Sequence, residues 1–494
     1  MTLAILSATF YILSFPNFNQ AWLAWISLVP LSILAHKSSP RQAFLWGWLS
    51  GTLAYGGILS WLIVTFQAAH LSIFLAGFCL LILAGYLGLY WGVWAGFLSY
   101  CFSRPVRTNQ PIASFEQVER SNWMPFYGAA AWVALEYLRT YLFSGFPWVL
   151  LADSQVKILP LIQIASLTGT YGVSFLIVWI NLALAAWPPK RLAVPLVVVA
   201  MTCLYGYLRM KSLSGEPAGR TLRVALLQGN IDQYKKWDKT YVQEIQKTYE
   251  ELIEKAADAK PDIILWPETS VPGYLLQDPP LRSWLQQTIR KSHSSHLVGA
   301  PVMHEDKAYN SSFSLTPEGD LSGEYAKKHL VPFGEIVPWA SVLGRFFTVL
   351  NELGGFTAGQ NSPVLNIAGY PIGVNICYEA IFPNLVRQSV RQGAQVIANL
   401  TNDGWYMRTS APYQHWAPNI FRAVENARWL IRADNTGISG VIDPSGRVII
   451  TSPIFQPHLL IGTVVPRQET TPYTRAGDVF SWLCCLIGTI ALFA

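Results

Sequence analysis

Three residues that could share one reaction each lie at or just beyond the end of a short stretch that is typical of a strand. Cys377 and Lys327 each end such a stretch, and Glu268 follows another after a proline. A thiolate is a nucleophile, a nearby carboxylate is a general base for it, and a lysine stabilises the thiolate and a developing oxyanion. Singly, each has an ordinary reading, because free cysteines are mostly buried and charged side chains mostly solvated. Together they predict covalent catalysis by a cysteine.

The elements around these residues should bring them to one edge of a sheet. The run 371–376 is typical of a buried strand and 380–392 of an amphipathic helix, so Cys377 lies on a strand-to-helix turn. Backbone N–H groups at the start of such a helix can hold an anion. In α/β folds, ligands bind where the strands end, which is where Glu268 and Lys327 are also expected.

The stretch 222–451 alternates strand and helix signals. This alternation predicts an α/β sheet layered with helices. We expect strands at 222–228, 262–266, 296–299, 310–315, 323–327, 371–377, 394–399, 430–435, 440–442 and 448–451, and helices at 241–257, 279–293, 380–392 and 414–427.

The remainder of the chain is apolar enough to enter a membrane. Of the 494 residues, 52% are hydrophobic and 13% are charged, about half the charged fraction of an ordinary soluble domain. Charge is concentrated between 220 and 475. We therefore predict a transmembrane helical bundle at 1–210, a polar domain at 211–476 and a C-terminal transmembrane helix at 477–494. The net charge of +6 does not call for a nucleic-acid partner, because many Lys and Arg residues flank the predicted spans.

Eight apolar stretches are long enough, or nearly so, to cross a bilayer. They are 1–15, 20–36, 42–66, 72–102, 123–143, 158–187, 191–208 and 478–494. Basic residues concentrate in alternate linkers, such as Lys37 and Arg41, Arg104 and Arg107, and Lys190. By the positive-inside rule, both termini are expected in the cytoplasm and the polar domain on the opposite side of the membrane.

The cysteines and the short motifs indicate which kinds of site to exclude. Of the six cysteines, five lie in or at the ends of predicted spans, and Cys377 is alone in the polar domain. That domain is therefore expected to hold no internal disulfide. The sequence contains neither a CxxC nor an HExxH pattern, and we predict neither a metal site nor a cofactor.

Two ionisable residues fall within the predicted span 123–143. Glu136 and Arg139 are spaced to share one helix face. Ionisable residues inside a span usually face the bundle interior or a cavity. The alternative is that the two simply pair near the membrane surface and fix the packing, and the sequence leaves both open.

The motifs around the three candidates resemble those of a known family. Trp266-Pro267-Glu268, Lys327 and Cys377-Tyr378-Glu379 match the Glu–Lys–Cys pattern of the nitrilase superfamily. Four further runs resemble the bacterial apolipoprotein N-acyltransferases within it: 227–231 (LQGNI), 236–237 (KW), 325–335 (YAKKHLVPFGE) and 401–405 (TNDGW). Together with the predicted membrane spans, this resemblance covers essentially the whole chain.

The resemblance implies a nitrilase-like αββα sandwich for the polar domain and a ping-pong acyl transfer. Cys377 would take the sn-1 acyl chain of a membrane phospholipid as a thioester. The α-amine of a diacylglyceryl-cysteine at a lipoprotein's N-terminus would then accept it. Glu268 would be the base, and Lys327 would stabilise the oxyanion together with backbone N–H groups near Tyr378. The protein would lie in the bacterial cytoplasmic (inner) membrane, with the catalytic domain on the periplasmic side.

Four further residues match family positions that support catalysis or bind substrate. Glu335 would orient either Lys327 or the incoming amine, and Trp237 would help to form the acyl or lipoprotein site. Tyr378 and Glu379 would also belong to the site. For these last two, the alternative is that they only pack and cap the helix after the nucleophile.

Three other functions compete with this interpretation. A membrane-tethered, nitrilase-like amidase acting on a soluble amide would use the same triad, and lipid dependence of turnover would separate the two. A non-enzymatic scaffold would be expected to have a broken triad, whereas Glu268, Lys327 and Cys377 are all present. A cysteine protease with His415 as the partner of Cys377 would leave the other two residues without a role.

Overall fold

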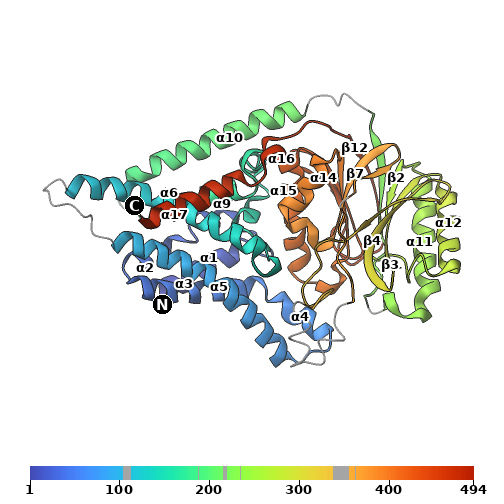
Figure 1. The fold of residues 1–494 in the computed structure, drawn as a ribbon, viewed down its shortest axis with the longest axis horizontal. Helices are drawn as coiled ribbons and strands as arrows, with labels where there is room; N and C mark the ends of the chain where they lie inside the picture. Colours follow the sequence, from blue (N-terminus) through green and yellow to red (C-terminus); the bar gives the residue numbers. More distant parts are fainter. Residues whose placement is uncertain are drawn as a thin grey trace. The chain divides into compact units, whose positions relative to one another are not determined.

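The computed structural model describes residues 1–103, 113–186, 189–214, 220–233, 235–337, 355–361 and 363–493; the side chains of residues 103, 113–122, 189–190 and 237 lie outside this description. The chain forms two compact units, whose elements are labelled in Figure 1. Unit 1 comprises Met1–Ser212, Thr409–Ala417 and Ala476–Ala494, and unit 2 comprises Leu213–Arg408 and Pro418–Arg475.

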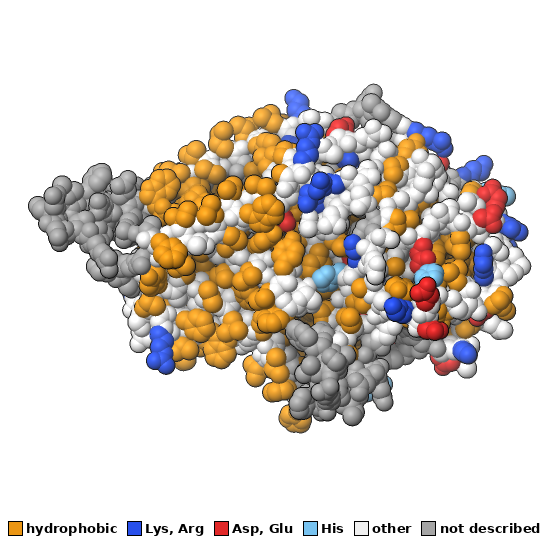
Figure 2. Space-filling model, viewed as in Figure 1, with side chains coloured by type: hydrophobic (Ala, Val, Ile, Leu, Met, Phe, Trp, Pro, Cys, Tyr) orange, Lys and Arg blue, Asp and Glu red, His pale blue; other side chains and the backbone are white. Residues whose placement is uncertain are grey.

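Unit 1 is built from apolar helices. They are α1 (Thr2–Leu13), α2 (Val29–His36), α3 (Pro40–Ile58), α4 (Trp61–Ala68), α5 (Ile73–Ser103), α6 (Ala113–Tyr141), α7 (Leu159–Ile162), α8 (Ala165–Thr168), α9 (Tyr171–Ala185), α10 (Ala193–Leu213) and α17 (Val479–Phe493). Large apolar side chains are exposed on their outer faces, among them Phe74 and Phe78 of α5 and Val197 of α10. Figure 2 shows hydrophobic side chains gathered over these helices. Such a surface suits contact with lipid.

The number of membrane spans is only partly settled by the structure. Among the described residues, Ile73–Phe102 and Ala193–Leu213 are each long and apolar enough to cross a membrane. Two bent helix pairs, Pro40–Ile58 with Trp61–Ala68 and Leu159–Thr168 with Tyr171–Ala185, would raise the total to four if each is one span. The expected eight spans stay a prediction, because the apolar helices Thr2–Leu13, Ala21–His36 and Val479–Phe493 are shorter than a bilayer requires.

Helices α3 and α5 pack closely because glycines lie between them. Gly47 and Gly51 of α3 are four residues apart, as are Gly88 and Gly92 of α5. A Cβ added to Gly47 would lie 2.5 Å from the backbone oxygen of Trp91 on α5. Small residues at this spacing let membrane helices approach backbone to backbone.

Unit 2 contains two six-stranded sheets, with strand orders β12-β1-β2-β3-β4-β5 and β11-β10-β9-β8-β7-β6. The first sheet comprises β1 (Leu222–Gln228), β2 (Ile263–Leu265), β3 (Ser295–His304), β4 (Lys307–Leu315), β5 (Leu321–Ala326) and β12 (His458–Val464). The second comprises β6 (Leu365–Ile367), β7 (Tyr370–Ile376), β8 (Val396–Thr401), β9 (Trp429–Asp434), β10 (Gly440–Ile442) and β11 (Val448–Thr451). The central strands β1, β2 and β3, and likewise β7, β8 and β9, run parallel.

Helices cover the outer faces of both sheets. Helices α11 (Val242–Ala257) and α12 (Pro279–Ser292) lie on one side, and α14 (Pro383–Arg391) with the later part of α15 (Ala411–Asn426) lies on the other (Figure 1). The predicted αββα sandwich is therefore confirmed. Helices α11 and α12 bury apolar residues against the first sheet, and Tyr249 stacks on Trp266 with ring centroids 4.7 Å apart. This packing fixes the end of β2, which leads to the candidate base.

Several predicted boundaries were wrong. The helix expected at 380–392 begins at Pro383, because Cys377–Ile381 forms a 3₁₀ turn first. The strand expected at 296–299 continues to His304, where it forms a hairpin with β4. Strands β6 and β12 were not predicted, and β12 pairs antiparallel with β1 from the opposite end of the unit's sequence. Strand β6 has three residues and β12 pairs with a strand that is distant in sequence, so neither carries a strong local signal.

Candidate active site

Glu268 and Lys327 meet beyond the ends of β2 and β5. The Lys327 ammonium lies 3.0 Å from Glu268 Oε1 and 2.9 Å from Glu335 Oε1, and the lysine side chain is 1% exposed. Asn310 Nδ2 on β4 donates to the same two oxygens, at 2.7 and 2.9 Å. One cation and one amide thus hold two carboxylates together. The structure brings these predicted residues into a single cluster.

Cys377 directly follows β7, and the charges of Glu268 and Lys327 both affect the pKa of its thiol. Burial raises the pKa of the Cys377 thiol well above its usual value; the charge of Glu268 raises it further, and the charge of Lys327 lowers it. Burial lowers the pKa of Lys327, but the carboxylates of Glu268 and Glu335 outweigh this effect and hold that pKa well above its usual value. The resting site therefore contains a thiol and an ammonium, and the thiol needs a base before it can attack.

The backbone at Cys377 is held in an uncommon conformation by Glu379. Cys377 has φ of 52°, in the left-handed region that non-glycine residues seldom adopt. The Glu379 carboxylate accepts four hydrogen bonds at 2.7–3.1 Å, so both of its oxygens are engaged within the protein. The donors are the backbone N–H groups of Ile376, Lys328 and His329 and the hydroxyl of Tyr325. Glu379 thus ties the cysteine turn to the segment after Lys327, which favours the capping alternative over substrate binding.

The other predicted site residues are placed as follows. The buried ring of Tyr378 packs near His329 and Phe382, with centroids 5.8 and 5.3 Å away. Glu335 Oε2 accepts the backbone N–H of Val331 at 2.8 Å, so both Glu335 oxygens have partners. Trp237 ends a 3₁₀ turn that starts at Lys235, and its side chain lies outside the described part of the structure.

Two residues of the cluster were not singled out in the sequence. Asn310 lies inside β4, where only the strand register reveals that its amide reaches Glu268 and Glu335. Lys236 is 3% exposed, and its Nζ donates to the backbone oxygen of Glu268 at 2.8 Å. The sequence pointed to Lys236 only through its place in the KW run. Because Lys235 is adjacent, the sequence did not show which of the two lysines is buried.

A second cluster of buried charge lies at the ends of β8 and β9. Arg432 Nη2 contacts Asp403 Oδ2 at 2.8 Å and Asp434 Oδ2 at 3.0 Å, and all three side chains are fully buried. Burial raises the pKa of Asp434 to about 6, with the charge of Asp403 adding to the rise and that of Arg432 opposing it. Asn399, which Arg432 contacts at 3.0 Å, donates weakly to the backbone oxygen of Cys377 at 3.4 Å. This cluster supports the site, because Asn399 links Arg432 to the backbone of Cys377.

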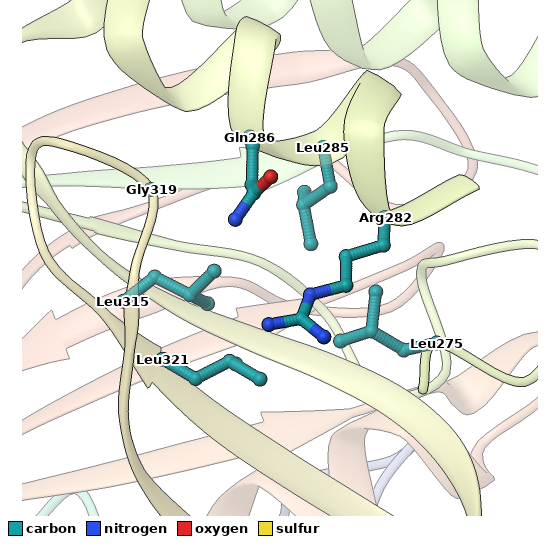
Figure 3. A pocket seen from close by; sticks show the side chains of 7 residues that line it. All are labelled: Leu275, Arg282, Leu285, Gln286, Leu315, Gly319 and Leu321. Atoms are coloured by element: carbon teal, nitrogen blue, oxygen red, sulfur yellow. The ribbon is translucent and has the colours of Figure 1, made fainter. Parts of the chain in front are cut away.

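Pockets also lie elsewhere among the described residues. One lies under α12 and is lined by four leucines, Arg282, Gln286 and Gly319 (Figure 3). It contains no nucleophile or base. Another, in unit 1, is a small cavity bordered by Glu136, Arg139 and Tyr55. Arg139 donates to the Tyr55 hydroxyl and Glu136 accepts the backbone N–H of Leu151, so both ionisable residues face the interior of the unit. In the part of the chain that the structure covers, no group of three His, Cys, Asp or Glu side chains could hold a metal ion.

His415, which the protease alternative requires as the partner of Cys377, packs against an aromatic residue of unit 1. It belongs to the Thr409–Ala417 segment of unit 1, where its ring stacks on Trp148 with centroids 5.4 Å apart. The neighbouring Gln414 accepts hydrogen bonds from the indoles of Trp61 and Trp148, at 3.0 and 2.8 Å. These contacts give the segment a packing role within unit 1.

Comparison with known proteins gives matches along almost the entire chain. Residues 7–183 match the model for the apolipoprotein N-acyltransferase N-terminal domain, and residues 223–473 match that for carbon-nitrogen hydrolase. The apolipoprotein N-acyltransferase of Geobacter metallireducens is 38% identical, covering 98% of this chain and 92% of its own length. Those of Methylococcus capsulatus and Pseudomonas putida are 34% and 32% identical, covering 97% and 96% of this chain and 92% of their own lengths. A solved amidase from Nesterenkonia sp. is similar at 21% identity and a TM-score of 0.40, covering 54% of this chain and 97% of that chain, a likeness that carries no argument about activity.

Proposed function

This chain belongs to the apolipoprotein N-acyltransferase family, and we propose on that premise that Cys377 carries an acyl group between two lipid substrates as a thioester. The chemistry is N-acyl transfer. The observation that carries the residue assignments is the Lys327 ammonium, held by Glu268 and Glu335 beside a buried thiol. The proposed donor is a membrane phospholipid, and the proposed acceptor is the N-terminal diacylglyceryl-cysteine of a lipoprotein.

In the first half-reaction, Glu268 accepts the proton of Cys377 as sulfur attacks the carbonyl carbon of the sn-1 ester. The carbonyl oxygen becomes an oxyanion, which the Lys327 ammonium and backbone N–H groups near Tyr378 stabilise. The tetrahedral intermediate collapses by breaking the ester C–O bond. The leaving alkoxide takes the proton from Glu268, so a lysophospholipid departs and the thioester remains.

In the second half-reaction, the neutral α-amine of the lipoprotein attacks the thioester carbonyl carbon. Glu268 accepts a proton from the attacking nitrogen, and Lys327 stabilises the second oxyanion. Collapse breaks the C–S bond and leaves an amide. The departing thiolate of Cys377 takes the proton from Glu268, which restores the enzyme.

Lys327 acts in this scheme as a fixed positive charge. Its raised pKa keeps it protonated in both steps, so it stabilises charge without transferring a proton. Two of its three N–H groups bond to Glu268 and Glu335, and the third has no partner among the residues that the structure describes. Because both oxygens of Glu335 are engaged, the contacts support a role in orienting Lys327 over one in holding the amine.

We further propose a multi-pass protein of the bacterial inner membrane with about eight spans. Residues 1–210 and 477–494 would lie in the membrane and residues 211–476 on the periplasmic side. The exposed apolar side chains of unit 1 and the basic linkers support this topology. An oxidation-dependent reporter fused into 211–476 should be active, whereas one in the 104–120 linker should be silent; the reverse pattern contradicts the topology.

Mass spectrometry of the full-length protein after incubation with phospholipid tests the reaction class. The Cys377 peptide should gain the mass of one acyl chain, and the gain should be removed by neutral hydroxylamine, which cleaves thioesters. Cys377→Ala should show no gain while remaining folded. An enzyme that turns over a soluble amide without lipid and never carries a lipid acyl chain would instead be the membrane-tethered amidase.

A further inference from the structure

A second buried lysine lies beside the candidate base. Lys236 Nζ donates to the backbone oxygen of Glu268 at 2.8 Å and to the hydroxyl of Thr269 at 3.0 Å. The side chain is 3% exposed. Its neighbour Lys235 is 41% exposed and pairs with Glu244 at 3.1 Å. Of two adjacent lysines, one is thus solvated and the other is turned into the site.

The surroundings of Lys236 make its burial costly. Lysines are almost never buried without a charged partner in contact, because burial penalises the charge. Both groups that Lys236 contacts directly are neutral, in contrast to the two carboxylates around Lys327. A negative charge that forms near Lys236 during the reaction would offset this cost.

The ionisable groups facing Lys236 come from the ends of three strands. They are Glu268 after β2, Cys377 after β7 and Asp434 at the end of β9. Glu268 is itself paired with Lys327, and Asp434 with Arg432. Cys377 is therefore the one facing group whose negative charge would appear only during catalysis and has no cation in direct contact in the described residues.

We propose that Lys236 is a positioning residue for acyl-enzyme formation, which fixes the turn of Glu268 by two hydrogen bonds and supplies positive charge to the Cys377 thiolate as it forms. This inference rests on the proposed thioester chemistry and adds a residue beyond the Glu–Lys–Cys triad. The hydrogen bonds of Lys236 go to the backbone oxygen of Glu268 and to the hydroxyl of Thr269, not to the thiol. Lys236 acts through the backbone of Glu268 and through its charge.

The charge of Lys236 gives this role a pH signature. Burial lowers the pKa of Lys236 to about 8, although Glu268, Asp434 and Cys377 oppose that effect. The ammonium is therefore present below pH 8 and lost above it. Because burial raises the pKa of the thiol well above its usual value, simple ionisation of Cys377 does not compensate near pH 8. Acyl-enzyme formation should fall as pH rises through about 8.

Single-turnover acylation of the full-length protein tests this inference. The probe is a vesicle of phospholipid with a labelled sn-1 chain, and the readout is the rate of thioester formation on Cys377 from below to well above pH 8. Lys236→Met should acylate about tenfold more slowly at neutral pH, the value of one charge-assisted hydrogen bond, and should lose the fall near pH 8. Lys236→Arg keeps its charge, so its profile should also lack the fall. Lys235→Met is the matched control and should behave as wild type.

The outcomes separate this inference from the proposed function. A Lys236→Met variant with the rate and profile of wild type would overturn the inference, as would a Lys236→Arg variant that still loses activity near pH 8. If Lys236→Met fails to fold, the Lys236→Arg profile decides alone. A wild-type protein that never forms a thioester on Cys377 would contradict the proposed function itself.

Discussion

Two buried clusters in the described part of unit 2 share one arrangement, a cation between two carboxylates. Lys327 lies 3.0 and 2.9 Å from Glu268 and Glu335, and Arg432 lies 2.8 and 3.0 Å from Asp403 and Asp434. Both clusters follow strand ends, one in each sheet. They differ in the cation, in the solvent exposure of the carboxylates and in whether the cation keeps an N–H group without a partner among the described residues.

The arginine cluster is closed. Arg432 also donates to the backbone oxygen of Ile438 at 3.1 Å and to Asn399 at 3.0 Å, and all three charged side chains are 0% exposed. The planar fork of arginine, once bonded in this way, is fixed in one orientation. Such a cluster holds β8 and β9 in place, which steadies the turn that follows the neighbouring strand β7.

The lysine cluster is open. The side chains of Glu268 and Glu335 are 8% and 14% exposed, and the compact ammonium keeps one N–H without a partner among the described residues. An ammonium can turn that N–H toward a new oxyanion without breaking its two existing bonds. We infer from this comparison that the lysine cluster, whose cation retains a donor, serves the proposed chemistry, and that the arginine cluster serves the architecture of the second sheet.

Lys327→Met should give the largest change in rate. Removing one oxyanion donor typically costs about 10²–10³ in rate, and both half-reactions form an oxyanion. Thermal stability in detergent should change less than it would in the arginine cluster, because the side chains of Glu268 and Glu335 are partly exposed to solvent. Single-turnover acylation of Cys377 measures the loss. Lys328→Met, whose lysine is half-buried and adjacent, is the matched control and should acylate normally.

Arg432→Met should give the opposite result, a large loss of stability with no specific loss of rate. It would leave two buried carboxylates without their cation, at a cost of about 3–5 kcal/mol in the free energy of unfolding. The unfolding temperature measures this, with Arg447→Met at an exposed position as control. An Arg432→Met variant that is as stable as wild type but barely acylates would show that the two clusters do not differ in role.

Glu335→Gln should slow the reaction less than Lys327→Met does, by about tenfold. The amide keeps the shape of the side chain but weakens the orientation of Lys327, so acylation and transfer should slow by the same factor. A chase with a diacylated lipopeptide after thioester formation measures the second step separately. Slow transfer with normal acylation would show instead that Glu335 positions the amine.

The ends of the predicted strands were sufficient to place Glu268, Lys327 and Cys377 together, whereas Glu335 was expected only from the resemblance to a known family. Apolar runs before Glu268 and Cys377 marked buried strands, and parallel strands in such sheets end at one edge. The sequence did not predict Asn310 or Lys236. The contacts of Asn310 depend on the register of β4, and Lys235 and Lys236 differ only in which side chain turns inward.

Pairings between distant segments were equally invisible in the sequence. Strand β12 joins the first sheet by pairing with β1, which lies more than two hundred residues earlier in the chain. No local sequence pattern predicts such a pairing. The role of Glu379 was left open for a similar reason, because its donors come from two separate segments, one running from the end of β5 to His329 and one at the end of β7. Side chains that join segments can be assigned only when both segments are in place.

The central claim is that the open lysine cluster supports a thioester on Cys377 that passes its acyl group to an amine. The direct measurement is a single-turnover experiment with full-length protein and a phospholipid labelled in its sn-1 chain, followed by a diacylated lipopeptide with a free α-amine. The claim predicts hydroxylamine-sensitive label on Cys377 that moves, one for one, into a hydroxylamine-resistant amide on the peptide. Label released as free fatty acid, or amide formed without label ever reaching Cys377, would contradict it.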